Sequence, residues 1–321
     1  MNSRAGLVVV IAIWLGAASA VSGQVQSGPD DRAKDIDFSL LEHNAEQGDA
    51  KAAYQLGRSY LTGSGVGQDD AQAAKWFRQA AAKGSADAEF ALGYLYEQGK
   101  GVERDYRQAV GYYAAAAKQG HSMAQNNLAS MYQHGQGVRR DLQQAARWYR
   151  AAAEKGEATA ECNLASMYFS GKGVARSYEQ AAEWFRVAAE HGDATAQENL
   201  AWMYYTGTGM TRDYGEAARW VRRSAQQGSA RAQLDLGYLY EQGNGVPLDY
   251  VSSYMWYKAA MAGGEHRAAA QLKAISRVMT QEQIAEGTKR ATALSMSRAA
   301  TVGAGEANTI GTGFISEDNK R

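Results

Sequence analysis

The chain has 321 residues, with 34 Lys and Arg against 34 Asp and Glu, so its formal net charge is zero. This neutrality excludes the strongly basic surface expected of a nucleic-acid-binding protein. A single cysteine excludes an intramolecular disulfide framework and a thiolate-rich zinc site. Glycine is abundant and proline is scarce (35 and 2 residues), which indicates many turns between segments that lack helix breakers.

The N-terminus has the pattern of an export signal. Arg4 precedes an apolar segment at 7–15, and the small residues of 18–20 match a cleavage site that ends at Ala20. The apolar segment is shorter than the roughly 20 residues that span a bilayer. We therefore expect a signal peptide at 1–20, no stable membrane insertion after cleavage, and a polar linker at 21–36.

A 36-residue period organises the chain that follows. Glycine recurs at Gly48, Gly84, Gly120, Gly156, Gly192, Gly228 and Gly264. Leucine keeps the same interval at Leu56, Leu92, Leu128, Leu164, Leu200 and Leu236. A G-x-G pair also occurs once in every period, beginning with Gly63-Ser64-Gly65. The period defines six repeats: 49–84, 85–120, 121–156, 157–192, 193–228 and 229–264.

Each repeat is predicted to form two helices. In the first helix, apolar residues at a spacing of four form one stripe, and the G-x-G pair ends the helix because glycine tolerates positive φ. The second helix starts at an N-cap residue, namely Asp69, Asp105, Asp141, Ser177, Asp213 or Asp249. Five of these six residues are followed by Gln or Glu three positions later, as in a capping box. The buried stripe of the second helix in the third repeat is Ala145, Trp148, Tyr149 and Ala152, and we expect Trp148→Ala to cost about 3–5 kcal/mol.

Helical caps are expected at both ends of the repeats. A helix over 37–46 covers the first repeat, and 265–291 forms the C-terminal cap, with Thr280 as the N-cap of its last helix. From 292 to 321 the sequence has weak periodicity and is predicted to be a disordered tail. The predicted fold is an all-α, right-handed α-solenoid of six helix-turn-helix repeats, covering 37–291 with its caps.

The repeated motif resembles the Sel1-like repeat family, whose members are related to the tetratricopeptide repeat. The motif is A-x-x-x-L-G/A-x-x-Y, G-x-G-V, D-x-x-x-A-x-x-W and A-A-x-x-G, and a full copy runs from Ala88 to Gly120. The resemblance implies a solenoid adaptor that binds proteins, with exported bacterial members acting in envelope regulation, host interaction or assembly. A subfamily associated with β-lactam binding has a disulfide in each repeat, and this chain departs from it because its one cysteine is Cys162.

The sequence contains no recognisable catalytic or cofactor site. None of the five histidines lies three or four positions from another, so no helical metal face exists, and surface or capping roles are expected for them. Cys162 is interpreted as a packed small side chain. The G-x-G pairs follow helices and lack a P-loop lysine, which favours helix termination over phosphate binding. We therefore predict that the protein is not an enzyme and needs no cofactor or metal.

Two columns of the first helix vary between repeats and lie opposite its apolar stripe. One column is rich in Asn, which suits hydrogen bonding to an extended peptide or, equally, contacts between neighbouring repeats. The other column contains large aromatic residues, for which binding is the favoured interpretation. The candidate partner-binding residues are Asn127, Asn163, Asn199 and Asp235 of the first column, Tyr94, Trp202 and Tyr238 of the second, and Phe169 and Tyr205 nearby.

The predicted function is an exported, periplasmic adaptor that captures a protein or peptide in the concave groove of the solenoid. A role in envelope signalling or exopolysaccharide production is one interpretation. The alternatives are an immunity protein against a secreted or periplasmic toxin, a secreted host-interaction factor, and a β-lactam-binding enzyme, which the missing cysteines disfavour. The sequence does not define the partner or an oligomeric state.

Overall fold

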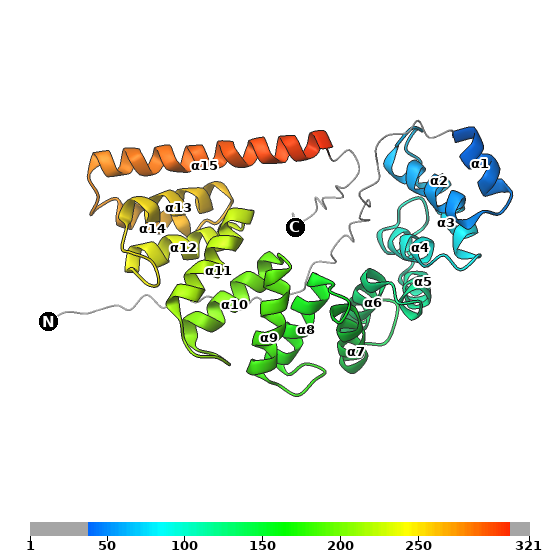
Figure 1. Cartoon of the computed structure of the whole chain (residues 1–321), viewed down its shortest axis with the longest axis horizontal. Coiled ribbons are helices and arrows are strands. Elements are labelled where there is room, and N and C mark those ends of the chain that lie inside the picture. The colour runs from blue at the N-terminus through cyan, green and yellow to red at the C-terminus, as the bar shows by residue number, and fades with distance from the viewer. Residues whose placement is uncertain (1–37, 309–321) are drawn as a thin grey trace. The chain divides into compact units, whose positions relative to one another are not determined.

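The computed structural model describes residues 38–308, which form helices and no strands (Figure 1). The helices are α1 (Phe38–Glu46), α2 (Ala50–Thr62), α3 (Asp70–Ala81), α4 (Ala86–Gln98), α5 (Tyr106–Lys118), α6 (Ser122–His134), α7 (Leu142–Ala153), α8 (Ala158–Ser170), α9 (Tyr178–Glu190), α10 (Ala194–Thr206), α11 (Tyr214–Gln227), α12 (Ala230–Gln242), α13 (Tyr250–Ala262), α14 (Ala268–Ile275) and α15 (Gln281–Asn308). The six predicted helix pairs are therefore confirmed, and the predicted signal peptide and linker lie outside the described residues.

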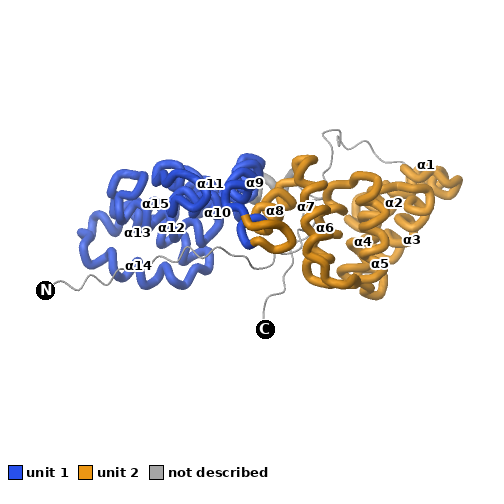
Figure 2. Tube along the Cα trace, turned by 90° about the horizontal axis from the view of Figure 1, so that it is seen from below, with its two compact units in different colours: residues 1–16, 168–170, 177–304 blue, residues 17–167, 171–176, 305–321 orange. Residues whose placement is uncertain are grey.

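The described chain divides into two compact units (Figure 2). One unit, drawn in orange, contains α1 to α7 with residues 158–167 and 171–176. The other unit, drawn in blue, contains residues 168–170 and 177–304. Within each unit the two helices of a repeat pack on each other, as α4 does on α5 and α12 on α13, and successive repeats join by contacts such as α5 with α6 and α11 with α12.

The turns follow from glycine at fixed positions. All the positive-φ residues in the described chain are glycines, and they are the 36-period glycines together with both members of every G-x-G pair. The first glycine of each pair is left-handed and caps its helix, as Gly63 does by donating its N–H to the carbonyl of Ser59 at 2.8 Å. The second glycine brings the turn against the preceding repeat, since a Cβ on Gly137 would overlap the carbonyl oxygen of Tyr106.

The predicted N-caps of the second helices are confirmed. Asp69, for example, accepts hydrogen bonds from the backbone N–H groups of Ala71 and Gln72 at 2.9 and 3.0 Å. The backbone N–H of Asp69 itself donates to the carbonyl of Tyr60 at 2.9 Å, and the other five caps repeat this bond to the tyrosine of their own repeat. The capping-box prediction is therefore only half realised in these helices, because a backbone carbonyl already occupies the donor that a glutamine would take.

The core lies between the two helices of each repeat. The six 36-period leucines are almost completely buried, at 0–1% exposed. On the second helix the position after the tryptophan, or after Tyr112 in the second repeat, is buried in every repeat and holds Phe77, Tyr113, Tyr149, Phe185, Val221 and Tyr257. In the fifth repeat Trp220 itself is buried still more deeply, at 1% against 5% exposed for Val221. Trp148 itself is only partly buried, while Tyr149 is fully buried. Both residues belong to the predicted stripe, but the cost expected for Trp148→Ala is lowered because part of its indole stays exposed.

Both caps form as helices. α1 begins at Phe38 and packs on α2, as predicted. At the other end Thr280 and Gln283 form a reciprocal capping box, in which Gln283 N–H donates to Thr280 Oγ1 at 3.3 Å and Thr280 N–H donates to Gln283 Oε1 at 2.9 Å. The sequence predicts loss of order after 291, but α15 continues to Asn308. Part of the predicted tail at 292–321 is therefore helical, and its remainder at 309–321 lies outside the described residues.

Candidate functional site

Four of the predicted binding residues line one pocket in the unit that contains α9 to α15. Trp202 and Tyr205 come from α10, and Asp235 and Tyr238 come from α12, so each repeat contributes one turn of its first helix. The remaining lining residues are Glu198, Ala201, Ala217, Val221 and Leu239. The pocket has aromatic and aliphatic walls with two carboxylates among them, which is the usual composition of a binding site with a few orienting polar groups.

Neighbouring rings hold the aromatic wall in place. Phe169, a further predicted binding residue, packs edge-on against Trp202 with ring centroids 5.8 Å apart. Tyr205 packs against Tyr214 at 5.0 Å, and its hydroxyl accepts a hydrogen bond from the Asn244 side chain at 3.4 Å. Because these rings are supported from behind, their exposed faces are preorganised for contact.

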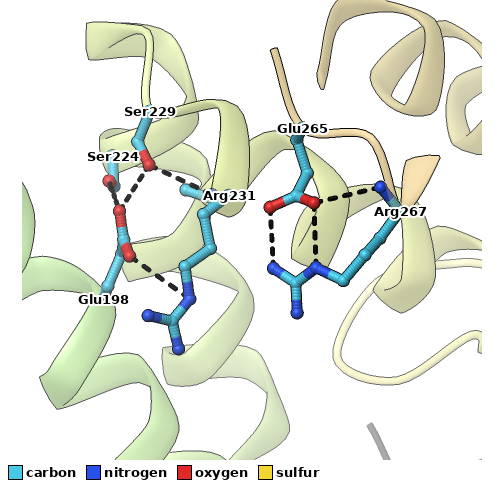
Figure 3. Close-up of polar contacts among 7 residues, drawn as sticks. Glu198, Ser224, Ser229, Arg231, Glu265 and Arg267 are labelled. Carbon is cyan, nitrogen blue, oxygen red and sulfur yellow. Dashed lines mark hydrogen bonds and ion pairs between the residues drawn. The ribbon is translucent and has the colours of Figure 1, made fainter. Parts of the chain in front are cut away.

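Glu198 is anchored beside the pocket by groups from three other segments (Figure 3). The hydroxyls of Ser224 and Ser229 both donate to its Oε1, at 3.0 and 2.5 Å. The guanidinium of Arg231 lies 3.8 Å from its Oε2. With a side chain only 18% exposed, Glu198 is therefore hydrogen-bonded and charge-compensated inside the protein.

A second ion pair lies after α13. Arg267 donates from Nε and Nη2 to the two carboxylate oxygens of Glu265, at 2.8 and 2.7 Å, and its backbone N–H also reaches that carboxylate (Figure 3). This bidentate contact lowers the pKa of Glu265, with hydrogen bonding from Arg267 as the main cause.

Asp235 differs from both glutamates. Across residues 38–308 its carboxylate makes neither a hydrogen bond nor an ion pair within bonding distance. Burial raises the pKa of Asp235 from 3.8 to about 7, and the charges of Glu198 and Glu265 raise it further while those of Arg231 and Arg267 oppose the shift. Asp235 thus exchanges a proton near neutral pH, in a pocket where burial outweighs the charges of Arg231 and Arg267.

This pKa predicts a pH-dependent stability. A carboxyl whose pKa is higher in the folded than in the unfolded protein holds its proton more tightly when folded, so the free energy of unfolding decreases from about pH 4 to about pH 7. We expect Asp235→Asn, which mimics the neutral acid, to remove this part of the decrease. Denaturant unfolding at about pH 4.5, 6 and 7.5 measures it. Parallel pH profiles of the two proteins would contradict the assignment.

The other predicted residues lie elsewhere. Tyr94 is half-buried in the unit of α1 to α7, with the ammonium of Lys100 5.6 Å from its ring. Asn127 is 6% exposed and accepts a hydrogen bond from Asn126 at 3.3 Å, and Asn163 donates to Asn126 at 3.2 Å.

Asn199 is also 6% exposed. The contact of Asn163 with Asn126 corresponds to the structural alternative that the sequence leaves open for this column, namely contacts between neighbouring repeats. Binding roles for Tyr94 and the three asparagines stay predictions.

Glu198 is the one charged residue of the pocket lining that the sequence alone does not identify. Its repeat position is otherwise occupied by Tyr54, Phe90, Asn126, Cys162 and Leu234, which indicates a packing position. The available signal is that Glu198 is the only charged residue of its column, and Asp235 is the only charged residue of the neighbouring one. Both acids occur in adjacent repeats, which is what brings them to one pocket.

His121 has one of the capping roles that the sequence predicts for the histidines. His121 caps α6 by accepting a hydrogen bond from Ala124 N–H at Nδ1, at 3.2 Å, and stacks on Phe90. Burial lowers the pKa of His121, so the neutral ring suits this acceptor role. No group of three or more His, Cys, Asp and Glu side chains within 38–308 is arranged to hold a metal ion. Cys162 is 6% exposed and packs inside its repeat, as expected.

None of the helices among the described residues is both long and apolar enough to cross a membrane.

The fold and the pocket define an α-helical repeat protein of the kind that serves as a scaffold for protein–protein interaction. The Sel1 repeat model matches six consecutive segments: 50–85, 86–121, 122–157, 158–193, 194–229 and 230–264. The chain therefore belongs to the Sel1 repeat family, whose fold is generally a non-enzymatic interaction scaffold. The matched segments keep the predicted 36-residue period, displaced by one residue.

Solved structures support the family. The chain is 36% identical to c5321, described as a protective antigen of uropathogenic Escherichia coli with an SLR fold, at a TM-score of 0.74. That match covers 79% of this chain and 55% of c5321, so the chain spans about half the length of that protein. A Sel1 repeat protein from Oxalobacter formigenes is 30% identical at a TM-score of 0.63, covering 70% of this chain and 90% of the other.

A more distant similarity is to the immunity protein Pa5087 from Pseudomonas aeruginosa, at 20% identity and a TM-score of 0.41, covering 70% and 81% of the two chains. Among curated proteins none matches this chain.

Proposed function

We propose that the protein is an exported adaptor that binds a protein or peptide partner at the pocket between α10 and α12. The observation that carries this proposal is the set of three aromatic rings, Trp202, Tyr205 and Tyr238, which line one pocket at positions where the repeats differ. Large aromatic residues in preorganised pockets are enriched among the residues that dominate binding energy.

The repeat core does not require these three rings, and this supports the proposal. The core of each repeat is completed by the leucine of the first helix and the residue after the tryptophan of the second, and both are buried in every repeat. Trp202 and Tyr238 are partly exposed instead, and the same column holds Arg58, Ser130 and Ser166 in other repeats. Aromatic residues that the repeat does not require are thus available for a partner.

We expect the wild-type protein to capture a stoichiometric partner from envelope extract, and the Trp202→Ala/Tyr238→Ala double variant to lose it. Each truncation of such an anchor costs about 2 kcal/mol or more of binding free energy, so retention falls by well over tenfold. The measurement is affinity capture followed by quantification of the bound protein.

The matched control is Tyr204→Ala/Tyr240→Ala. These tyrosines lie on the same two helices outside the pocket, and their hydroxyls accept hydrogen bonds from Arg186 and Arg222 at 3.4 and 3.0 Å. Full retention by the control and loss by the pocket variant supports the proposal. Equal retention by both variants contradicts it.

The proposed location is the periplasm, which rests on the signal-like sequence at 1–20. Cell fractionation and N-terminal sequencing test it, with a mature chain that starts at Val21 as the expected result. Recovery from the culture medium would favour a secreted host-interaction factor, and capture of a toxin would favour an immunity protein.

A further inference from the structure

Among the described residues, the carboxylate of Asp235 is the one acidic group of the pocket between α10 and α12 that has no hydrogen bond or ion pair at bonding distance, although Arg231 and Arg267 act on it from further away. Glu198 has two serine hydroxyls and Arg231, and Glu265 has Arg267. With Asp235 ionised, three carboxylates face two guanidiniums, so the local charge is negative by one unit. The pocket therefore attracts a single positive charge.

The pocket's walls favour the same kind of group. Trp202, Tyr205 and Tyr238 line it together with Asp235. Aromatic faces attract a cation that approaches within about 6 Å, and the attraction increases when water is excluded.

The size of the pocket favours lysine over arginine as the basic side chain that binds. It leaves a free volume of about 10 Å³, roughly what one water-sized group requires. An ammonium is a compact point charge on a flexible four-carbon stem, whereas a guanidinium is a wider planar fork. The space matches an ammonium group alone, with the stem of a lysine outside it, whereas the wider guanidinium would require the walls to move.

We propose that this pocket receives the ε-ammonium of a partner's lysine, which pairs with the Asp235 carboxylate while its stem lies against Trp202 and Tyr238. This inference rests on the proposed function and adds to it the chemistry of the partner. The lysine replaces the missing counter-charge, and binding draws Asp235 into its ionised form.

Affinity consequently depends on pH. The charged and titratable groups that face Asp235 are Arg231 on its own helix, Glu198 on α10, and Glu265 and Arg267 after α13. Both glutamates are paired with arginines, so Asp235 is the group whose protonation changes near neutral pH. Lysine binding should weaken as the pH falls below about 7.

The test is a titration of the full chain with N-acetyl-lysine-N-methylamide. Binding is monitored through the NMR signal of the Trp202 indole N–H. The norleucine and arginine analogues serve as matched ligands. We expect a saturable shift that is at least about tenfold tighter for lysine than for either analogue, a difference of roughly 1.4 kcal/mol. We also expect its loss in Asp235→Asn, its retention in Tyr240→Ala, and a weaker affinity at about pH 5.5 than at pH 8.

Equal binding of norleucine or arginine overturns the inference, as does unchanged lysine binding by Asp235→Asn. The pH series of the wild-type protein tests the inference without any substitution, since an affinity independent of pH also overturns it. An Asp235-dependent shift caused by Mg²⁺ at lower concentration would assign the pocket to a metal ion instead. If the protein captures a partner through Trp202 and Tyr238 but does not bind lysine, this inference is wrong. The proposed function is still supported in that case.

Discussion

Tyr149→Ala should lower the free energy of unfolding by about 3–5 kcal/mol, more than Trp148→Ala does, although tryptophan is the larger residue. Tyr149 is 0% exposed, and the free energy lost on truncation follows the buried area and the cavity that remains. Trp148 is only partly buried at the edge of its cluster, so its neighbours lose fewer contacts.

Denaturant unfolding followed by circular dichroism measures both costs. Tyr149→Phe is the control, because it keeps the buried ring and removes only the hydroxyl, which is hydrogen-bonded to Ser130. Its expected cost is about 1 kcal/mol. If Trp148→Ala proves as costly as Tyr149→Ala, the assignment of the core to the residue after the tryptophan is wrong.

Gly137→Ala should destabilise the protein by about 3 kcal/mol or more, because strain and a steric clash coincide at this position. Gly137 has a φ of +67°, which alanine adopts only at a cost. A Cβ there would also overlap the Tyr106 carbonyl oxygen, a backbone atom that cannot rotate away. Relief would require the turn to move away from the start of α5, which separates two neighbouring repeats.

Gly111→Ala is the matched control for Gly137→Ala. Gly111 lies inside α5, is exposed, and would place its Cβ more than 4 Å from other groups. The same chemical change should therefore stabilise the protein by about 0.5–1 kcal/mol through helix propensity and the entropy of the unfolded chain. A change of the same sign at both glycines would contradict the role given to the G-x-G turns.

The local structure of the repeats follows closely from the sequence. Residues such as Gly137 and Asp141 act through their own backbone geometry or through neighbours a few positions away, so their recurrence every 36 residues is enough to place turns and helix starts. The sequence did not predict in the same way that Tyr149 is more deeply buried than Trp148. Both belong to one apolar stripe, and only the packing of the facing helix decides which of them is covered.

The ends of the repeats and the pocket depend on contacts that no single repeat contains. α15 extends past 291 although its sequence there has weak periodicity, and its first turns pack on α13, where Lys258 reaches Thr288 at 3.3 Å. Glu198 escaped prediction because its partners Ser224, Ser229 and Arg231 come from the next helix, the next inter-repeat turn and the next repeat. The comparison of repeat positions identified Trp202, Asp235 and Tyr238 as unusual. That these residues line one pocket could be seen only in the folded structure.

The most direct test of the account is photocrosslinking in living cells, with the photoreactive residue benzoyl-phenylalanine placed at one tyrosine of α12 at a time. Tyr238 lines the pocket, whereas Tyr240 lies outside it and its hydroxyl bonds to Arg222. The account predicts a discrete crosslinked partner from position 238 and none from position 240. Crosslinking from position 240 alone, or from neither position, would contradict it.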